Sequence, residues 1–558
     1  MSLAEELEKT IRGEVETLPE VLLHYSRDAS LFVIRPEAVV HPLDAGDIGA
    51  LVRFVSEHQG NTPAEGSPRR RLTLTARAAG TDMSGGPLND SIIVDTTKHL
   101  NHLLELGERS AMVEPGMYFR DFDRETKKKN LELPSYTASR EINTVGGMVA
   151  NNSGGEKNLK FGKTARYVEE LEVVLSDGKP HTFRKFEGDA LQVKLREQSF
   201  EGELYRKVAA LVQENREVIE KAKPKVEKNS SGYALWDLGD AVNSLNLARL
   251  MVGAQGTLGI ITKIRFALTA PKPYSAMVVL FLDKLSELGE VVPEVLKHAP
   301  DSFESYDDHT FSIALKYFPE LAVQMKAGIF SLGVSFLPEV WMALTGGVPK
   351  LILLVEFRAD TQAEALRRAE ALSAEAKKNR SHIGVRVAKS EQAARKYWAV
   401  RRESFNLLRK KIRGLRTAPF IDDFVVPPLK LPEFLPKLEE ILSHYDLTYT
   451  IAGHVGDGNF HIIPLVDPKR TDTAKIIDEL SHKVYDLVIS YSGSISGEHN
   501  DGLIRTPYVE KMFGTDMYNL FVQIKKIFDP QNIFNPGKKV GTTFAEALRH
   551  LDLPSVKK

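Results

Sequence analysis

The sequence predicts an α+β protein of two or three domains, on three observations. The chain has 558 residues, which is too long for a single hydrophobic core. In the first half, short strands and helices are broken by Gly-rich loops. In the second half, amphipathic helices such as 361–377 alternate with strands, which indicates an α+β domain with an antiparallel sheet.

The chain divides into four segments. Residues 1–40 are expected to form a helical N-terminal segment and residues 41–272 a first domain, because Pro271 and Pro273 mark a boundary. Residues 273–541 form the second domain and residues 542–558 a tail. The apolar stretch 328–357 is too interrupted by Pro and charged residues for a transmembrane helix. We expect a buried helix followed by a core strand at 351–357, with a membrane-facing patch as the open alternative.

The composition excludes several classes of protein. Lys and Arg total 74 and Asp and Glu total 75, so no global field attracts nucleic acid. The absence of cysteine excludes disulfides, thiolate metal sites, a cysteinyl-linked cofactor and an iron–sulfur cluster on this chain. The acidic N-terminus lacks the features of a secretory signal. The expected location is therefore the cytoplasm or the periphery of a membrane.

Three Gly-rich loops are candidates for phosphate binding. They span Leu74–Gly86, Val113–Gly155 and Gly253–Ile261, and each exposes backbone N–H groups of Gly, Ser, Thr or Asn residues. None has the spacing of the dinucleotide fingerprint or of a Gly-Lys-Ser/Thr loop. A Rossmann or ATP-binding site is therefore excluded, while a different phosphate-containing cofactor is not.

A predicted β-hairpin carries two histidines. Residues 448–453 and 459–466 are rich in β-branched and aromatic residues, and Val-Gly-Asp-Gly lies between them. In such a hairpin His454 faces Asn459, and His461 lies on the same face as Asn459, diagonal to His454. The two imidazoles are then within reach of one small ion.

A Glu-His pair at Glu498 and His499 completes the candidate centre. Two imidazoles and the Glu498 carboxylate make a three-ligand divalent site with open positions, for which zinc and manganese are both suitable. Glu498 and His499 serve one site only if the chain bends at Gly497 and after His499. The alternative is that both hairpin histidines are structural; the Gly-flanked Glu-His pair favours the metal site.

These motifs resemble a known flavoprotein family. The three loops, in this order, resemble the FAD-binding domain of the vanillyl-alcohol oxidase and p-cresol methylhydroxylase (PCMH) family. The hairpin, the Glu-His pair and Asn-Pro-Gly-Lys at 535–538 resemble its D-2-hydroxyacid dehydrogenase branch. The resemblance implies a two-subdomain PCMH-type FAD-binding domain over residues 41–272 and a C-terminal substrate domain with an antiparallel sheet over residues 273–541.

The resemblance also implies the site residues. Metal ligands are His454, His461 and Glu498, the catalytic base is His499, and Asn459 joins the catalytic residues. Arg401, in the element Trp398–Arg401, matches the arginine for the substrate carboxylate; a helix-surface arginine is the alternative. FAD-binding residues are Gly80, Thr81, Ser84, Gly85, Pro134, Thr144, Gly146, Gly147, Asn151, Gly154, Gly155, Gly253, Gly256, Thr257, Gly259, Ile260, Asn535 and Lys538. Because Thr81 stands where covalent members carry histidine, the FAD is expected to be noncovalent.

The implied activity is oxidation of a D-2-hydroxy acid of the D-lactate, D-2-hydroxyglutarate or glycolate type. Electrons would pass to a quinone, a cytochrome or a separate iron–sulfur protein rather than to NAD, and a homodimer is one expected assembly. The lack of a lysine at 421–423 argues against strict specificity for hydroxyglutarate. Two alternatives are a flavoprotein subunit that assembles with an iron–sulfur partner and a non-redox enzyme similar to alkylglycerone-phosphate synthase. The second is disfavoured because the chain lacks a histidine-rich stretch.

Overall fold

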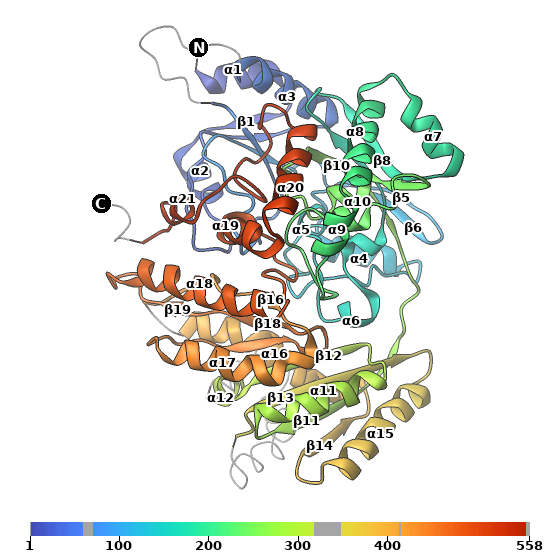
Figure 1. The fold of residues 1–558 in the computed structure, drawn as a ribbon, viewed down its shortest axis with the longest axis vertical. Coiled ribbons are helices and arrows are strands. Elements are labelled where there is room, and N and C mark those ends of the chain that lie inside the picture. Colours follow the sequence, from blue (N-terminus) through green and yellow to red (C-terminus); the bar gives the residue numbers. More distant parts are fainter. Residues whose placement is uncertain (1, 60–70, 317–347, 412–413, 554–558) are drawn as a thin grey trace.

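The computed structural model describes residues 2–59, 71–316, 348–411 and 414–553. The helix expected within 328–357 falls largely in 317–347, outside the described residues. Figure 1 shows two halves, with the N-terminal elements in the upper half and most elements after residue 273 in the lower half. None of the helices in the described part is long and apolar enough to cross a membrane.

The first sheet contains residues from the N-terminal segment. It has four strands in the order β1-β2-β4-β3, which are β1 (Glu14–Glu16), β2 (Ala38–His41), β3 (Leu74–Arg77) and β4 (Ile92–Asp95). Strands β2, β4 and β3 are parallel. Helices α1 (Leu3–Thr10), α2 (Pro19–Tyr25) and α3 (Ala45–Gln59) belong to the same region. The expected helical segment at 1–40 therefore contains short strands beside its two helices, because a three-residue strand such as β1 is too short to show a periodicity.

The second sheet is antiparallel and completes the half that the sequence predicts to bind FAD (the FAD-binding half). Its six strands have the order β5-β6-β10-β7-β8-β9. The strands are β5 (Leu103–Leu106), β6 (Ser110–Val113), β7 (Val168–Val174), β8 (Pro180–Glu187), β9 (Ser244–Asn246) and β10 (Ile260–Ala267). The helices are α4 (Phe119–Lys127), α5 (Val145–Asn151), α6 (Asn158–Phe161), α7 (Gly188–Arg196), α8 (Phe200–Glu214), α9 (Arg216–Ala222) and α10 (Leu247–Met251). The two sheets form the two subdomains that the sequence predicts.

The substrate half is built on a seven-stranded antiparallel sheet of order β14-β11-β13-β12-β17-β18-β16. Its strands are β11 (Tyr274–Leu282), β12 (Ser302–Asp307), β13 (Leu351–Ala359), β14 (Gly384–Ala388), β16 (Phe424–Val425), β17 (Ile451–His454) and β18 (Asn459–Ile462). The short strands β15 (Arg416–Thr417) and β19 (Leu465–Val466) pair separately. The predicted antiparallel sheet and the predicted core strand at 351–357 are confirmed.

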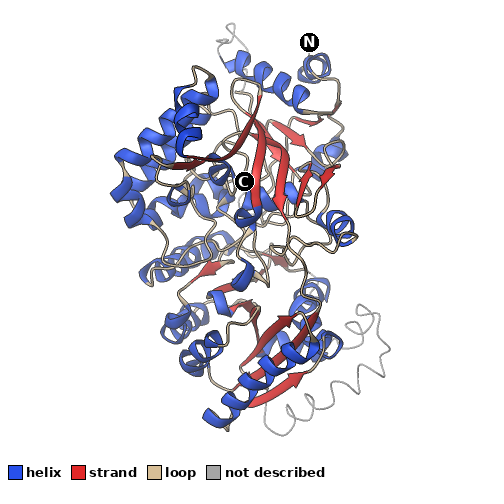
Figure 2. Ribbon diagram, turned by 90° about the vertical axis from the view of Figure 1, so that its right-hand side faces the viewer, coloured by secondary structure: helices blue, strands red, loops and turns tan. Residues whose placement is uncertain are grey.

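Helices flank the strands of both halves (Figure 2). In the substrate half they are α11 (Leu288–Lys297), α12 (Asp308–Lys316), α15 (Gln362–Asn379), α16 (Glu391–Lys411), α17 (Leu431–Ser443) and α18 (Thr473–Ser490). The Thr361 hydroxyl accepts from the N–H of Glu364 and caps α15. The helix predicted at 361–377 is thereby confirmed.

The chain returns to the FAD-binding half after residue 500. Helices α19 (Gly502–Phe513) and α20 (Thr515–Phe528), red in Figure 1, lie in the upper half. Their side chains Phe513, Met517, Phe521 and Phe528 share one core with Tyr205 of α8. Residues 502–541 were expected in the substrate domain, and in the structure helices α19 and α20 pack against the core of the other half, because an apolar helix face does not specify its packing partner. The expected tail also contains a helix, α21 (Phe544–Leu548).

Candidate active site

The three Gly-rich loops line one cavity. From the first loop come residues 76–83 and Gly86; from the second, Pro115 and residues between 137 and 154; from the third, Gln255, Gly256 and Gly259. Glu498 and His499 line the same cavity. The cavity therefore joins the predicted cofactor loops to the predicted catalytic centre.

The predicted cofactor residues divide into two groups. Those that line the cavity are Gly80, Thr81, Thr144, Gly146, Gly147, Asn151, Gly154, Gly256 and Gly259. The remainder, which do not line it, are Ser84, Gly85, Pro134, Gly155, Gly253, Thr257, Ile260, Asn535 and Lys538. Asn535 shows what the second group does, because its Nδ2 donates to the carbonyls of Gly86 (3.0 Å) and Gln255 (2.7 Å). This side chain thus connects the first and third loops without lining the cavity itself.

A carboxylate that the sequence analysis did not select organises the first loop. Asp82 accepts hydrogen bonds from the N–H groups of Ser84 (2.9 Å) and Gly86 (2.8 Å) and from Nδ2 of Asn151 (2.7 Å). The N–H of Gly85 donates to Asp28. The backbone N–H groups of Ser84, Gly85 and Gly86 are thus occupied within the protein, whereas Gly80 and Thr81 face the cavity.

The predicted hairpin forms with the predicted register. Strands β17 and β18 pair His454 with Asn459 and Ala452 with His461. Gly458 has φ of +70° in the turn, a conformation that glycine adopts without strain. The His454 and His461 rings lie 5.3 Å apart. Asn459 is fully buried and donates to Asp423 (3.1 Å) and to the carbonyl of Phe424 (3.0 Å), so it braces the site without lining the cavity.

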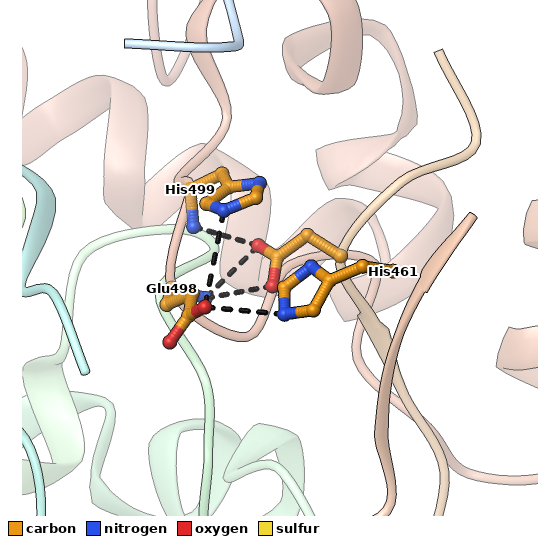
Figure 3. A group of neighbouring side chains, drawn as sticks. His461, Glu498 and His499 are labelled. Carbon is orange, nitrogen blue, oxygen red and sulfur yellow. Dashed lines mark hydrogen bonds and ion pairs between the residues drawn. The ribbon is translucent and has the colours of Figure 1, made fainter. Parts of the chain in front are cut away.

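Three imidazoles converge on Glu498. Its Oε1 atom lies 3.3 Å from Nε2 of His454, 3.2 Å from Nε2 of His461 and 3.9 Å from Nε2 of His499. Figure 3 shows Glu498 between His461 and His499. Ligand atoms of Asp423, His461, Glu498 and His499 all lie within 4.8 Å of one another. These nitrogen and oxygen donors fit a small divalent cation.

A tight turn brings the adjacent residues Glu498 and His499 to the same centre. The Asp423 carboxylate accepts from the N–H groups of Glu498 (2.9 Å) and His499 (2.7 Å). The N–H of Gly497 donates to the carbonyl of Asp423. Asn500 has φ of +69°, which turns the chain away after His499. The bend that the sequence analysis required is present, and the carboxylate of Asp423, directly before β16, holds it.

Further charged side chains surround the centre. Nδ1 of His454 lies 2.6 Å from Oε1 of Glu304 on β12. Asp422 contacts Nδ1 of His461 and of His499. Nζ of the fully buried Lys228 lies 2.8 Å from Oε2 of Glu498. The sequence analysis missed Glu304, Lys228 and Asp422; the adjacent acids at 422 and 423 were the one local signal.

These contacts shift the pKa values of His461 and Glu498. Burial alone would lower the pKa of His461, but the carboxylates of Asp422 and Glu498 outweigh burial and raise it to about 10. Burial would raise the pKa of Glu498, but Lys228, His454 and His461 hold it well below its usual range. Without a metal the His461 imidazole forms charged pairs with these carboxylates, and a bound cation would replace its proton at Nε2.

Arg401 lies on α16 beside this centre. Its Nη2 is 3.4 Å from Oε2 of Glu304, and only 14% of its side chain is exposed. The alternative of a surface arginine is therefore wrong. Glu304 contacts both Arg401 and His454, so the predicted carboxylate-binding arginine and a predicted metal ligand share one partner.

The fold and the site define a two-domain FAD-binding oxidase. Residues 36–184 match the family model described as an FAD binding domain, and residues 272–539 match the model described as FAD linked oxidases, C-terminal domain. The chain belongs to the FAD-linked oxidase family, and the flavoprotein resemblance seen in the sequence is confirmed.

Relatives and a solved structure agree with this family. The chain is 28% identical to D-2-hydroxyglutarate dehydrogenase of Pseudomonas putida over 94% of this chain, and it spans about half (50%) of that relative's length. It is 26% identical to glycolate oxidase subunit GlcD of Bacillus subtilis, covering 92% of both chains. The structure of 4-ethylphenol oxidase from Gulosibacter chungangensis superimposes with a TM-score of 0.68 at 14% identity, covering 97% of both chains, and at this identity the likeness shows the fold.

Proposed function

We propose that this protein oxidises a D-2-hydroxy acid to the corresponding 2-oxo acid, with FAD as the hydride acceptor. The observation that carries the proposal is the convergence of His454, His461 and His499 on Glu498, at the wall of the cavity that the FAD-binding loops line. The reaction requires a proton acceptor and a flavin in one place, and a cation near the hydroxyl would stabilise the alkoxide. This site brings residues suited to each task together.

His454, His461 and Glu498 would hold a divalent cation, zinc or manganese. Support comes from the two Nε2 atoms within 3.3 Å of Glu498 Oε1 and from the room left for substrate, because three protein ligands leave coordination positions open. When bound, the cation would supply positive charge that acidifies the substrate hydroxyl, and FAD would supply the hydride acceptor.

His499 would accept the hydroxyl proton at Nε2. Its imidazole lines the cavity, and Nδ1 contacts Asp422 at 2.7 Å, which leaves Nε2 on the side of Glu498. Arg401 would orient the substrate carboxylate through its guanidinium, which Glu304 anchors on one side. Asn459 would act on the reaction through Asp423 and the turn that carries His499.

The FAD would be held without a covalent bond. Thr81 lines the cavity where a linking histidine would stand, and the chain has no cysteine. Among the described residues that line the cavity, the only histidine is His499, which the proposed reaction uses as a base. The backbone of the first and third loops would approach the pyrophosphate.

The substrate class is that of D-lactate, D-2-hydroxyglutarate and glycolate, and the electron acceptor is a quinone, a cytochrome or a separate iron–sulfur protein. The relatives support the substrate class through their names. A second candidate function is that of a flavin subunit in a larger complex, because one relative covered over 92% of its length is named a subunit.

Anaerobic mixing with each acid tests the proposal. D-lactate, D-2-hydroxyglutarate or glycolate should bleach the flavin absorption of the purified, FAD-loaded protein within the dead time or over seconds, and L-lactate should not. If none of the three acids reduces the flavin in protein supplied with Zn²⁺ or Mn²⁺, the proposed reaction is contradicted.

A further inference from the structure

We propose that Asp422 is a positioning residue that presents the Nε2 atoms of His461 and His499 to the same point. The inference rests on the proposed function. It assigns to one carboxylate the orientation of a metal ligand and of the proton acceptor, which the sequence and the family comparison leave unassigned.

Asp422 lies beside Nδ1 of both rings, as a hydrogen-bond partner of His461 and as an ion-pair partner of His499. Oδ1 of Asp422 lies 3.1 Å from Nδ1 of His461, and Oδ2 lies 2.7 Å from Nδ1 of His499. On the opposite side, the Nε2 atoms lie 3.2 Å and 3.9 Å from Oε1 of Glu498. The rings stack with centroids 5.1 Å apart and an interplanar angle of 30°. Each imidazole therefore lies between the same two carboxylates.

This arrangement selects one tautomer for both imidazoles. A neutral imidazole has one N–H and one lone pair, and an ionised carboxylate only accepts hydrogen bonds. When a cation occupies the Glu498 side of the rings, Asp422 therefore keeps the N–H at Nδ1 and leaves the lone pair at Nε2. His461 needs that lone pair to bind a cation, and His499 needs it to accept a proton. A single buried acid meets both requirements.

Asp422 is itself held firmly. It is fully buried, and its carbonyl accepts a hydrogen bond from Nη2 of Arg505 at 2.7 Å. Nη1 of Arg505 donates to the carbonyl of Asn500 at 2.9 Å, so this arginine connects the loop before β16 to the turn after His499. Asp423 holds the backbone of that turn. The two adjacent acids therefore have different partners. Asp422 contacts the imidazole rings of His461 and His499, and Asp423 accepts hydrogen bonds from the backbone of the turn.

His454 offers an internal contrast. Its Nδ1 contacts Glu304, whereas the ion pairs of Asp422 in the described part of the chain are with His461 and His499. Loss of the Asp422 carboxylate should therefore weaken cation binding without abolishing it, because His454 and Glu498 keep their own partners. The same loss should slow proton removal, because His499 loses its orientation.

The test compares Asp422→Asn with a matched control, Asp307→Asn, in the full FAD-loaded chain. Asp307 is also buried, accepts from the N–H of Ile451 at 3.0 Å, and contacts none of the three centre histidines in the described residues. Zn²⁺ affinity is measured by competition with a chromophoric chelator, and flavin reduction by stopped flow. We expect Asp422→Asn to bind Zn²⁺ about 10–100-fold more weakly and to reduce its flavin at least about tenfold more slowly. The apparent Kd of the acid should stay within about threefold, because Arg401 is untouched.

The outcomes separate the two proposals. Wild-type protein that neither binds Zn²⁺ nor is reduced by any acid overturns the proposed function. If wild-type protein binds Zn²⁺ and is reduced by an acid, the role of Asp422 is tested by the variant. An Asp422→Asn variant whose Zn²⁺ affinity and rate of flavin reduction are both within twofold of wild type overturns that role. Asp307→Asn should match wild type in both.

A measurement on wild-type protein keeps the inference testable if Asp422→Asn loses its FAD or fold. In Zn²⁺-loaded protein labelled with ¹⁵N-histidine, the signals of His461 and His499 are assigned by their loss in His461→Gln and His499→Gln. Both rings should carry a proton on Nδ1. A proton on Nε2 alone of either ring would overturn the proposed orientation.

Discussion

Glu156, next to the second Gly-rich loop, forms an ion pair with Arg402 on α16, and this contact joins the two halves of the molecule. Nε of Arg402 donates to Oε2 of Glu156 at 3.1 Å, and Nη2 donates to Oε1. Tyr136 also donates to Oε1 of Glu156, at 3.1 Å. Charge-assisted bonds in this fork geometry are among the stronger polar contacts in proteins.

This pair predicts how stability depends on pH. Burial would raise the pKa of Glu156, but Arg402 and Arg140 outweigh burial and lower it to about 2, from an ordinary value of 4.5. Because the folded-state pKa is depressed, the stabilisation is present above about pH 4.5 and is lost as the pH falls towards 2. It amounts to at most about 3 kcal/mol. The Tm difference between wild type and Glu156→Gln should shrink between pH 6 and pH 3. Glu141→Gln, at an exposed carboxylate, should show no such trend.

The purified protein should be yellow and should release intact FAD when it is denatured, because no cysteine is available and Thr81 faces the cavity. Acid precipitation followed by chromatography of the supernatant measures this. Flavin that stays with the precipitated protein would contradict a noncovalent cofactor.

Substitutions at the neighbouring residues Gly146 and Gly147 should have different effects, one on stability and the other on FAD binding. A Cβ at Gly146 would lie 2.6 Å from the carbonyl oxygen of Pro115, whereas a Cβ at Gly147 meets only Thr144 Oγ1 at 3.5 Å and Ala78 Cβ at 3.7 Å. Gly146→Val should therefore destabilise the protein itself, while Gly147→Val should fold and fill cofactor space. Apoprotein Tm and FAD titration distinguish the two. Full FAD occupancy in Gly147→Val would show that the cofactor lies elsewhere in the cavity.

His454→Ala and His461→Ala should each lose bound metal and keep FAD, because both residues lie on the hairpin of the substrate half. Elemental analysis after gel filtration gives the metal content, and flavin absorbance gives the FAD content. His181→Ala is the control, since His181 pairs with Asp177 and Glu201 on the FAD-binding half. If both hairpin variants retain stoichiometric metal, the histidines are structural.

His499→Asn should keep FAD and metal yet reduce its flavin about 10²–10⁴-fold more slowly, which is the usual effect of losing a positioned acid or base. The imidazole lines the cavity and is not among the proposed ligands. Single-turnover stopped flow with the best acid measures the rate. A rate close to wild type would exclude His499 as the proton acceptor.

The sequence predicts best what local patterns determine. Alternation with period two and the Gly-containing turn were enough to place His454 opposite Asn459. The Gly-rich loops predicted a cavity but not which residues face it, because Asp82 and Asn535 bind loop groups through contacts that spacing does not reveal.

The side chains around the histidines could not be predicted in the same way. Lys228, Glu304 and Asp422 come from segments outside residues 454–499, and only Asp422, next to Asp423, has a local signal in the sequence. Their roles depend on tertiary packing. The return of α19 and α20 to the first core is of the same kind, since their apolar faces are visible in the sequence but the core that receives them is not.

Because the chain returns, the substrate half is an insertion within the FAD-binding half. It is entered between β10 and β11 and left before α19, so two separate crossings of the main chain connect it. Cleavage at one crossing, between Ala267 and Tyr274 for example, would leave the fragments joined through the shared core of α8 and α20. The proposed catalytic centre, with His454 on β17, His461 on β18 and Glu498 at the second crossing, thus lies at a boundary that a single break in the chain does not separate.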